Sequence, residues 1–353
     1  MNKLNLLRQA LVEQKLDALI ITNPFNRRYM TGFTGTAGVA IVSEKAAIFI
    51  TDFRYTSQAT TQVKDFTIVE HKQGLEQEVS NQLKEIHAKR IGFEKHDMSF
   101  ATYEQYQDVI DGQLIPTSEL VERLRMIKSD EELLVMKKAA EIADAAFEHI
   151  QGFIKPGVRE IEVSNELEFY MRKLGATSSS FDTIVASGFR SALPHGVASE
   201  KEIQNGELVT LDYGALYNGY CSDITRTVAV GEISEELRTI YNTVLEAQLI
   251  GVNGIKPGMT GKEADALTRD YITKAGYGQY FGHSTGHGLG MEVHEAPGLS
   301  YRSDVKLEVG MVVTVEPGIY IPRVGGCRIE DDIVITKDGN ERLTTSSKEL
   351  IIL

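Results

Sequence analysis

Short apolar runs alternate with amphipathic segments over the first third of the chain. Runs rich in Ile, Leu, Val and Ala predict strands, and segments with apolar residues at every third or fourth position predict helices. Because strands and helices alternate, we expect an α/β domain over residues 1–123. The expected strands cover residues 16–22, 39–42, 47–51 and 67–69, and the expected helices cover residues 3–14, 53–64 and 75–88.

A change of pattern predicts a second domain over residues 124–353. Residues 115–119 (IPTSE) carry turn signals, and Ser129-Asp-Glu-Glu132 matches a capping box, in which Ser and Glu satisfy the first free N–H groups of a helix. Apolar positions then recur at the spacing that one helix face requires. We therefore expect a long helix to begin this domain; its apolar positions are Leu133, Met136, Ala140, Ala143, Phe147 and Ile150.

The second domain contains an internal repeat. Ile154-Lys-Pro-Gly157 returns as Ile255-Lys-Pro-Gly258, an offset of 101 residues, and each copy lies between two helical patterns. At the same offset, Glu162, Tyr170, Lys173 and Gly175 return as Glu263, Tyr271, Lys274 and Gly276. This pattern predicts an α+β domain with two similar halves packed about a pseudo-twofold axis.

Each half also carries an apolar strand that runs into a carboxylate and then a glycine. These carboxylates are Asp212 in VTLDYG and Glu316 in VTVEPG, a second carboxylate follows each (Asp223 and Glu330), and His287 lies between the two pairs. Either acid of the first pair alone would be read as an ordinary acid beside a turn, but Asp212 ends an apolar run, where a buried charge is costly unless neutralised. Four carboxylates balance two divalent cations. We predict a dinuclear metal centre made by these five residues.

The spacing of the first pair can be tested by geometry. Asn218-Gly219 is a strong hairpin signal, and a turn centred there places Asp212 opposite Thr225 and makes Asp223 its diagonal neighbour. Diagonal partners lie roughly 7–8 Å apart at the backbone, on the same face of the hairpin. Both carboxylates can therefore reach a metal pair about 3.5–4 Å across.

Composition limits the partners of the protein. The chain has 353 residues, 42% of them hydrophobic and 25% charged, with a net charge of −13 and a pI near 5.2. An acidic surface argues against non-specific binding to nucleic acid or to anionic membranes. There is no apolar run of membrane-spanning length and no signal-peptide pattern at the N-terminus, and the two cysteines suggest no disulfide framework. We expect a cytoplasmic protein with no nucleic-acid or membrane partner.

Several motifs resemble one known family. The five predicted ligands fall in the order and local context of the metal ligands of the pita-bread metallopeptidases, which include methionine aminopeptidase, aminopeptidase P and prolidase. Residues 283–295 (HSTGHGLGMEVHE) resemble the proline-peptidase signature, and residues 326–331 (GCRIED) resemble its closing motif. Residues 33–38 (FTGTAG) and 51–55 (TDFRY) resemble the N-terminal domain of the proline-specific members. The resemblance therefore implies a pita-bread fold for residues 124–353.

The same resemblance implies a mechanism. Two divalent cations, Mn²⁺ first and Co²⁺, Zn²⁺ or Fe²⁺ as alternatives, would be bridged by a hydroxide that attacks the scissile carbonyl. Glu316 would also shuttle a proton to the leaving amine. His195 and His294 would hydrogen-bond the substrate and the developing oxyanion, and His283 would line the proline pocket.

Three further residues are candidates with open alternatives. Arg328 shares strand parity with Glu330, so it can steady a carboxylate ligand or the substrate, or form a structural ion pair. Tyr320 resembles an aromatic residue of the substrate pocket and is equally compatible with the core. Arg302 resembles an arginine that reads the terminal carboxylate of a dipeptide, and an exposed loop residue is its alternative.

The resemblance predicts a Xaa-Pro dipeptidase (prolidase) that acts on a small peptide with proline at the second position. The runner-up is aminopeptidase P, which accepts longer peptides, and a homodimer is implied for both. A non-catalytic peptide-binding scaffold of the same fold is a distant alternative. That alternative predicts missing ligands, whereas all five are present in this sequence.

Overall fold

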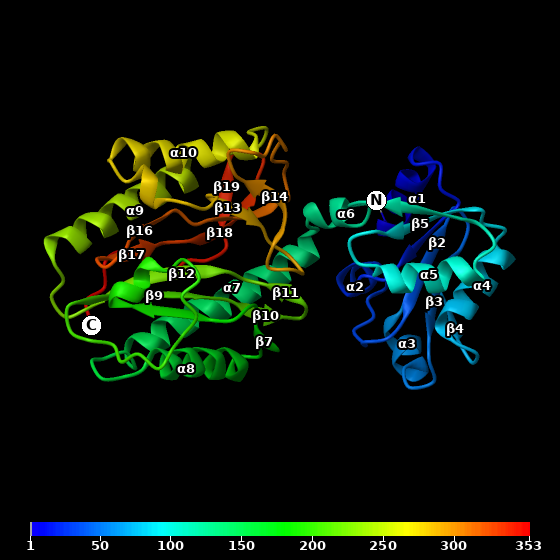
Figure 1. The fold of residues 1–353 in the computed structure, drawn as a ribbon, viewed down its shortest axis with the longest axis horizontal. Helices are drawn as coiled ribbons and strands as arrows, with labels where there is room; N and C mark the ends of the chain where they lie inside the picture. The colour runs from blue at the N-terminus through cyan, green and yellow to red at the C-terminus, as the bar shows by residue number, and fades with distance from the viewer. Residues whose placement is uncertain (1) are drawn as a thin grey trace. The chain divides into compact units, whose positions relative to one another are not determined.

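The chain divides into two compact units, with the division between Arg125 and Met126. The structure, a computed structural model, describes residues 2–353 (Figure 1). Each unit has its own hydrophobic core and is described by itself.

Unit 1 is built on a six-stranded mixed sheet with the strand order β4-β3-β2-β1-β5-β6. Strand β1 pairs antiparallel with β2 and parallel with β5, and the two outer strands, β4 and β6, pair parallel with their neighbours. The strands are β1 (Ala18–Ile21), β2 (Val39–Ser43), β3 (Ala47–Thr51), β4 (Thr67–Glu70), β5 (Arg90–Glu94) and β6 (Gln113–Thr117). The helices are α1 (Lys3–Glu13), α2 (Pro24–Thr31), α3 (Thr56–Gln62), α4 (Leu75–Glu85), α5 (Phe100–Val109) and α6 (Glu122–Met126).

The α/β character predicted for the first part of the chain is confirmed, and all seven expected elements are present as α1, α3, α4 and β1–β4. The sequence pattern missed α2, β5, α5 and α6. It was wrong at residues 115–117, which were expected to turn but form the end of β6. This strand lies at the sheet edge, where Pro116 removes no hydrogen bond from an inner ladder.

Unit 2 consists of helix pairs and antiparallel strands. Its helices are α7 (Asp130–Gln151), α8 (Glu160–Lys173), α9 (Glu235–Gly254) and α10 (Gly261–Lys274), with short 3₁₀ turns at Gly188–Ala192 and Gly278–Tyr280. Its strands are β7 (Ser178–Ser179), β8 (Ile184–Ser187), β9 (Glu207–Tyr213), β10 (Ala215–Tyr217), β11 (Tyr220–Cys221), β12 (Ile224–Val230), β13 (Gly286–Gly288), β14 (Glu295–Leu299), β15 (Val312–Val315), β16 (Gly318–Ile321), β17 (Gly325–Arg328), β18 (Asp331–Ile335) and β19 (Asn340–Arg342).

The two halves of unit 2 share one plan. The predicted capping box at Ser129 and Glu132 starts α7, and a second box at Thr260 and Glu263 starts α10. Each IKPG segment separates two helices and ends in a glycine with a left-handed backbone, at φ 89° for Gly157 and φ 87° for Gly258. The two segments break their helices in the same way, as the repeat predicts.

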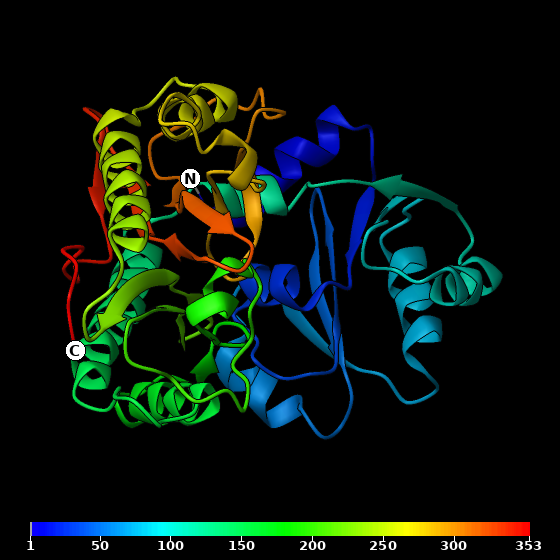
Figure 2. The same ribbon diagram turned by 60° about the vertical axis from the view of Figure 1, so that its left-hand side comes forward.

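Helices cover the outside of unit 2 and the strands lie between them (Figures 1 and 2). Side chains of α7 and α8 pack with those of β8, β9 and β12 in one buried cluster. Side chains of α9 and α10 pack with those of β14, β15 and β18 in another. The acidic strands of both halves are therefore enclosed between two helical layers.

The hairpin register is the predicted one. Asp212 lies opposite Thr225, and Tyr217 lies opposite Tyr220 across a turn in which Asn218 and Gly219 both have positive φ. Such a turn matches the twist of the strands that it joins. Asp212 and Asp223 therefore leave the hairpin on the same face.

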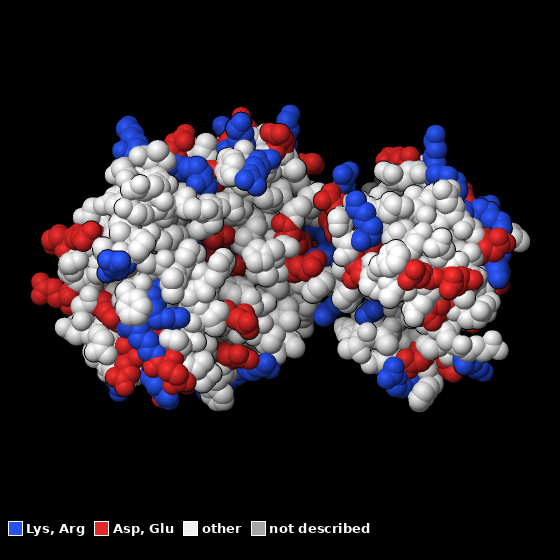
Figure 3. All heavy atoms as spheres, viewed as in Figure 1, with Lys and Arg blue, Asp and Glu red and all other residues white. Residues whose placement is uncertain are grey.

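The surface carries mixed charge. Figure 3 shows Lys and Arg interspersed with Asp and Glu on the face that it draws. Among the described residues, none of the helices combines the length and apolar character needed to cross a bilayer.

Candidate metal centre

Five strands of unit 2 bring the predicted ligands to one cavity of about 540 Å³. The five side chains are Asp212 in β9, Asp223 just before β12, His287 in β13, Glu316 just after β15 and Glu330 just before β18. Asp223 and Glu330 belong to different halves of the unit. The two carboxylate pairs thus converge as the repeat predicts.

The donor atoms lie close together. One donor atom each from Asp223, His287 and Glu330 lie within 4.8 Å of one another. The Nε2 atom of His287 is 3.3 Å from Oε1 of Glu316 and 3.8 Å from Oδ2 of Asp223. This spacing allows one cation to contact several of these atoms.

Two carboxylate oxygens at the centre have no hydrogen-bond partner although they are buried, namely Oδ1 of Asp212 and Oδ1 of Asp223. Burial, with the charges of Glu330 and Asp212 nearby, raises the pKa of Asp223 well above its ordinary value. Burial also raises the pKa of Glu330, and that of Glu316 to about 7. A bound cation stabilises buried carboxylates that repel one another and offers a partner to the two unpaired oxygens. The residues therefore fit a divalent metal centre.

Burial favours the neutral form of three histidines at the centre. Burial lowers the pKa of His283 to about 4 and also lowers the pKa of His287 and of His294. Nδ1 of His287 lies 3.1 Å from the carbonyl oxygen of Gly288, which leaves Nε2 directed at the carboxylates. A neutral imidazole held in this way is a suitable metal ligand.

Arg328 does not bond to Glu330, as strand parity suggested, but to the other carboxylate pair. Its Nη2 donates to Oδ2 of Asp212, its Nε to Oγ1 of Thr225 and its Nη1 to the hydroxyl of Tyr320. Tyr320 in turn lies 2.8 Å from Nε2 of His283. Arg328 and Tyr320 are thus buried supports of Asp212 and His283.

The other predicted site residues separate into two groups. His195, His283, His294 and Arg328 line the same cavity as the four acids and one histidine of the centre, and the rings of His287 and His294 are 4.3 Å apart. Tyr320 and Arg302 are not among the residues that line it. Arg302 is exposed beside Tyr301 in the loop after β14.

The loop that carries His195 has a buried anchor that the sequence analysis missed. Glu160, at the start of α8, is fully buried and accepts hydrogen bonds from Ser187, Ser199 and Arg190. These donors come from both sides of His195. No local pattern reveals this anchor, because glutamate at a helix start is common on protein surfaces.

Three more polar residues that were not predicted lie directly behind the ligands. Thr225 donates from Oγ1 to Oε2 of Glu330 at 2.6 Å, and Asp332 accepts from the backbone N–H of Asp223 at 2.9 Å. Arg226 donates to the backbone carbonyl of Glu330. A charged residue inside the apolar strand Ile224–Val230 was the available signal, since such a charge requires buried partners.

A duplicated α+β unit that gathers four carboxylates and an imidazole at a cavity defines a metal-dependent hydrolase. Residues 135–337 match the Metallopeptidase family M24, and residues 3–127 match the Creatinase/Prolidase N-terminal domain. The chain belongs to metallopeptidase family M24, and the predicted pita-bread fold and peptide-bond hydrolase activity are confirmed.

Among the similar proteins are one uncharacterized peptidase and two solved structures with a named activity. An uncharacterized peptidase of Bacillus subtilis, YqhT, is 62% identical over 99% of this chain and 100% of its own. The structure of a Xaa-Pro dipeptidase from Bacillus anthracis is 64% identical, covers 99% of both chains and has a TM-score of 0.99. The structure of an X-Pro aminopeptidase from Thermotoga maritima is 40% identical, covers 96% of this chain and 98% of that chain, and has a TM-score of 0.91.

Proposed function

We propose that this chain is a Xaa-Pro dipeptidase that works with two divalent cations, with Mn²⁺ the first candidate and Co²⁺, Zn²⁺ or Fe²⁺ as alternatives. Asp212, Asp223, His287, Glu316 and Glu330 would hold the cations. The observation that carries the proposal is that these five side chains line one cavity and leave two buried carboxylate oxygens without partners.

The substrate class is supported by the similarity to the Bacillus anthracis dipeptidase at 64% identity. The aminopeptidase from Thermotoga maritima, at 40% identity, keeps aminopeptidase P as the second candidate. The two candidates share the reaction and differ in whether the peptide extends beyond the proline.

The chemistry is divided between the cations and the chain. When bound, divalent cations acidify a water molecule and polarise a peptide carbonyl, which supplies the nucleophile and activates the electrophile. His195 and His294 line the cavity and are assigned to donate hydrogen bonds to the carbonyl oxygen of the substrate as negative charge develops on it. The Glu316 carboxylate, which faces both His283 and His287, is assigned to carry the proton to the leaving amine.

The Arg328–Tyr320–His283 chain would form one wall of the proline site. Because Tyr320 bonds to both neighbours at 2.8 Å, the imidazole of His283 has a fixed orientation. Arg302 remains the residue proposed to bind the terminal carboxylate of the substrate. This role has less support than that of His283, because Arg302 is exposed and does not line the cavity. If Arg302 has this role, Arg302→Gln will raise KM for a Xaa-Pro dipeptide and leave KM for its amide unchanged.

The test is a comparison of hydrolysis rates for a Xaa-Pro dipeptide and the matching Xaa-Pro-Xaa tripeptide, with the metal-stripped protein reloaded with Mn²⁺. We expect the dipeptide to have the higher kcat/KM and the stripped protein to have no activity. A faster tripeptide would move the assignment to aminopeptidase P. No hydrolysis of either peptide with Mn²⁺, Co²⁺, Zn²⁺ or Fe²⁺ would reject both.

Assembly and location complete the proposal. We assign a homodimer, by resemblance to the family, and a cytoplasmic location, which the two free, buried cysteines suit because a reducing compartment keeps thiols unpaired. Sedimentation at several protein concentrations would test the dimer.

A further inference from the structure

Arg226 is a buried arginine directly behind the metal centre. It is 1% exposed and is the largest of the fully buried side chains among the described residues. A guanidinium has five N–H groups, and here each has an acceptor. These acceptors are the carbonyl oxygens of Thr225, Glu330, Ser346 and Ser347 and Oδ1 of Asp331.

Two of these acceptors belong to the segments that carry the proposed ligands. The carbonyl of Glu330 is part of a ligand residue, and the carbonyl of Thr225 also accepts from the backbone N–H of Glu330 at 3.1 Å. The hydroxyl of Thr225 bonds to the Glu330 carboxylate itself. Arg226 thus fixes the backbone on both sides of the contact between β12 and the start of β18.

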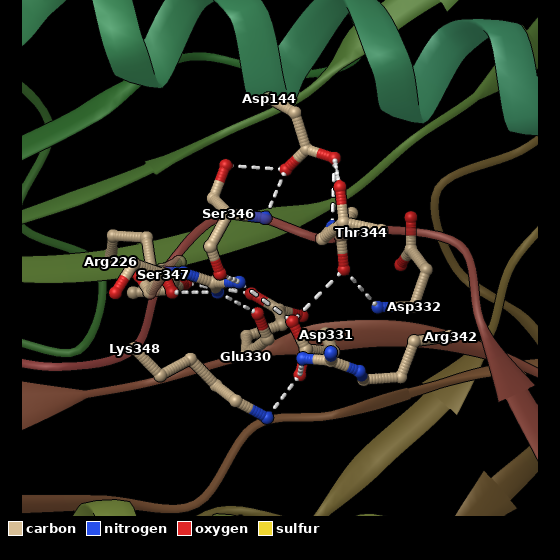
Figure 4. A network of polar contacts seen from close by, with 12 residues as sticks. Asp144, Arg226, Glu330, Asp331, Asp332, Arg342, Thr344, Ser346, Ser347 and Lys348 are labelled. Carbon is tan, nitrogen blue, oxygen red and sulfur yellow. Dashed lines mark hydrogen bonds and ion pairs between the residues drawn. The ribbon is translucent and has the colours of Figure 1, made fainter.

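The guanidinium is in turn held by a buried ion network (Figure 4). Asp331 accepts from Arg226 at 2.7 Å and from Nζ of Lys348 at 2.6 Å, and it is fully buried. Gln248 donates to the same carboxylate at 3.0 Å, and Nη1 of Arg342 lies 3.6 Å away. The network compensates the charge of Asp331, so Arg226 keeps its position next to the ligands.

The segment that follows β19 is part of the same network. Ser346 and Ser347 offer their carbonyl oxygens to Arg226, and Asp144 of α7 accepts from Thr345 and from both the N–H and the hydroxyl of Ser346. Figure 4 shows Asp144 on its helix directed at these residues. Arg226 therefore joins β12 to two segments that each lie more than a hundred residues further along the chain.

We propose that Arg226, secured by Asp331 and Lys348, is a positioning residue for the metal centre, which holds the backbone of Glu330 so that its carboxylate faces Asp223 before a cation binds. This inference rests on the ligand assignment in the proposed function. Asp223 and Glu330 repel each other in the absence of a cation, so their approach requires a scaffold that does not depend on the metal. A guanidinium holds five donors in one rigid planar fork, whereas an ammonium has three donors on a flexible stem.

A merely structural role makes a different prediction. If Arg226 served only the stability of the fold, its replacement would lower the free energy of unfolding, and the folded fraction would bind metal as tightly as the wild type. If it positions Glu330, folded protein will bind metal more weakly. The deciding quantity is therefore the metal dissociation constant of folded protein, and not activity.

The experiment is a titration of metal-stripped protein with Mn²⁺, followed by the electron paramagnetic resonance signal of free Mn²⁺, for the wild type, Arg226→Lys and Lys348→Met. Circular dichroism establishes the folded fraction of each apoprotein. We expect both variants to raise the dissociation constant by about 10–100-fold, the usual effect of removing a partner that orients metal ligands. Lys348→Met tests the inference if Arg226→Lys does not fold. It removes one support of Asp331, which holds Arg226, and keeps all five donors of Arg226.

Arg342→Met is the matched control. This arginine also faces Asp331, but at 3.6 Å and with 39% of its side chain exposed, so we expect less than about a threefold change in Mn²⁺ affinity, as for a solvent-screened ion pair. Equal affinity in the wild type and the folded variants would overturn the positioning role and leave the proposed function intact. Absence of Mn²⁺ binding to the wild type would overturn both.

Discussion

At the scale of single residues, the buried carboxylate of Asp223 is unfavourable unless a cation is bound. One of its oxygens lacks a donor, and burial, together with the carboxylates of Glu330 and Asp212, raises its pKa. Such a group destabilises the metal-free protein and becomes favourable when a cation balances the charge. Function and apoprotein stability therefore have opposite requirements at this position.

Replacement of Asp223 by asparagine tests this conflict. We expect Asp223→Asn to raise the unfolding temperature of the metal-free protein, because one of several repelling charges is lost, and to abolish most Mn²⁺ binding and activity. Differential scanning calorimetry with and without Mn²⁺ measures the first effect, and metal analysis measures the second. A variant that stays active and metal-loaded would remove Asp223 from the centre.

Apart from the five ligands, which the repeat and the family resemblance brought together, side-chain geometry was predictable only between partners near in sequence. Asp212 and Asp223 could be placed together because one tight turn sets the register between them. Arg328 could not be assigned to Asp212, nor Arg226 to Asp331, because more than a hundred residues separate the members of each pair. Such contacts depend on how the two halves pack, and no local pattern encodes that.

At the scale of elements, the short strand β13 places His287 through close backbone packing. A Cβ atom on Gly286 would overlap the carbonyl oxygen of Thr314, and one on Gly288 would overlap that of Ala296. The glycines on both sides of the histidine thus allow neighbouring backbones to approach. Gly282, in the same stretch, has nothing within 4 Å of the corresponding position.

This difference predicts unequal effects of the same substitution. Gly286→Ala must push β15 aside, so we expect a loss of about 1–3 kcal/mol in the free energy of unfolding, the usual cost of overpacking, together with weaker Mn²⁺ binding. Gly282→Ala should change neither the free energy of unfolding nor the affinity for Mn²⁺. Urea unfolding and metal titration of the two variants provide the comparison, and equal behaviour would show that close packing around β13 does not position His287.

In unit 1, Glu94 at the end of β5 connects the sheet to α2. It accepts from the backbone N–H groups of Thr22 and Asn23 and from Nδ2 of Asn26, all at 2.7 Å. Burial nevertheless raises the pKa of Glu94 to about 7. The folded protein therefore binds a proton at this residue more tightly than the unfolded chain does.

A pH dependence follows from the sign of this shift. Since the ordinary pKa is 4.5 and the folded value is about 7, the contribution of Glu94 to stability is full below about pH 4.5 and is lost as the pH rises to 7. The loss is on the order of 3 kcal/mol. We expect urea unfolding of Glu94→Gln to show a flatter decline over this range than the wild type, whatever its absolute stability. Parallel pH profiles of stability for the wild type and Glu94→Gln would contradict a raised pKa of Glu94.

At the scale of the whole molecule, all the proposed ligands lie in one of the two compact units. All five proposed ligands and Arg226, with the clusters that pack around them, belong to the unit Met126–Leu353. Fold class was predictable because the repeat and the hydrophobic period extend over many residues. Isolated elements such as α2 and β6 were missed because each is short and has a weak pattern.

We propose on this basis that residues 124–353 form an independent catalytic domain. Expressed alone, this fragment should unfold cooperatively and bind Mn²⁺ with the same stoichiometry as the full chain. Residues 1–123, the matched control, should bind no Mn²⁺ at concentrations that saturate the full chain. A fragment 124–353 that stays unfolded with Mn²⁺ present would show that the boundary does not separate folding units.

The cavity that holds the centre also limits what can be cleaved. A space of about 540 Å³ is within the range of small-molecule sites, and its acidic centre lies among buried strands rather than on an open surface. We expect a bond in the middle of a folded polypeptide to reach such a place far less easily than a bond in a loose fragment a few residues long. The shape of the cavity would then favour the short products of earlier proteolysis over the interior bonds of intact proteins.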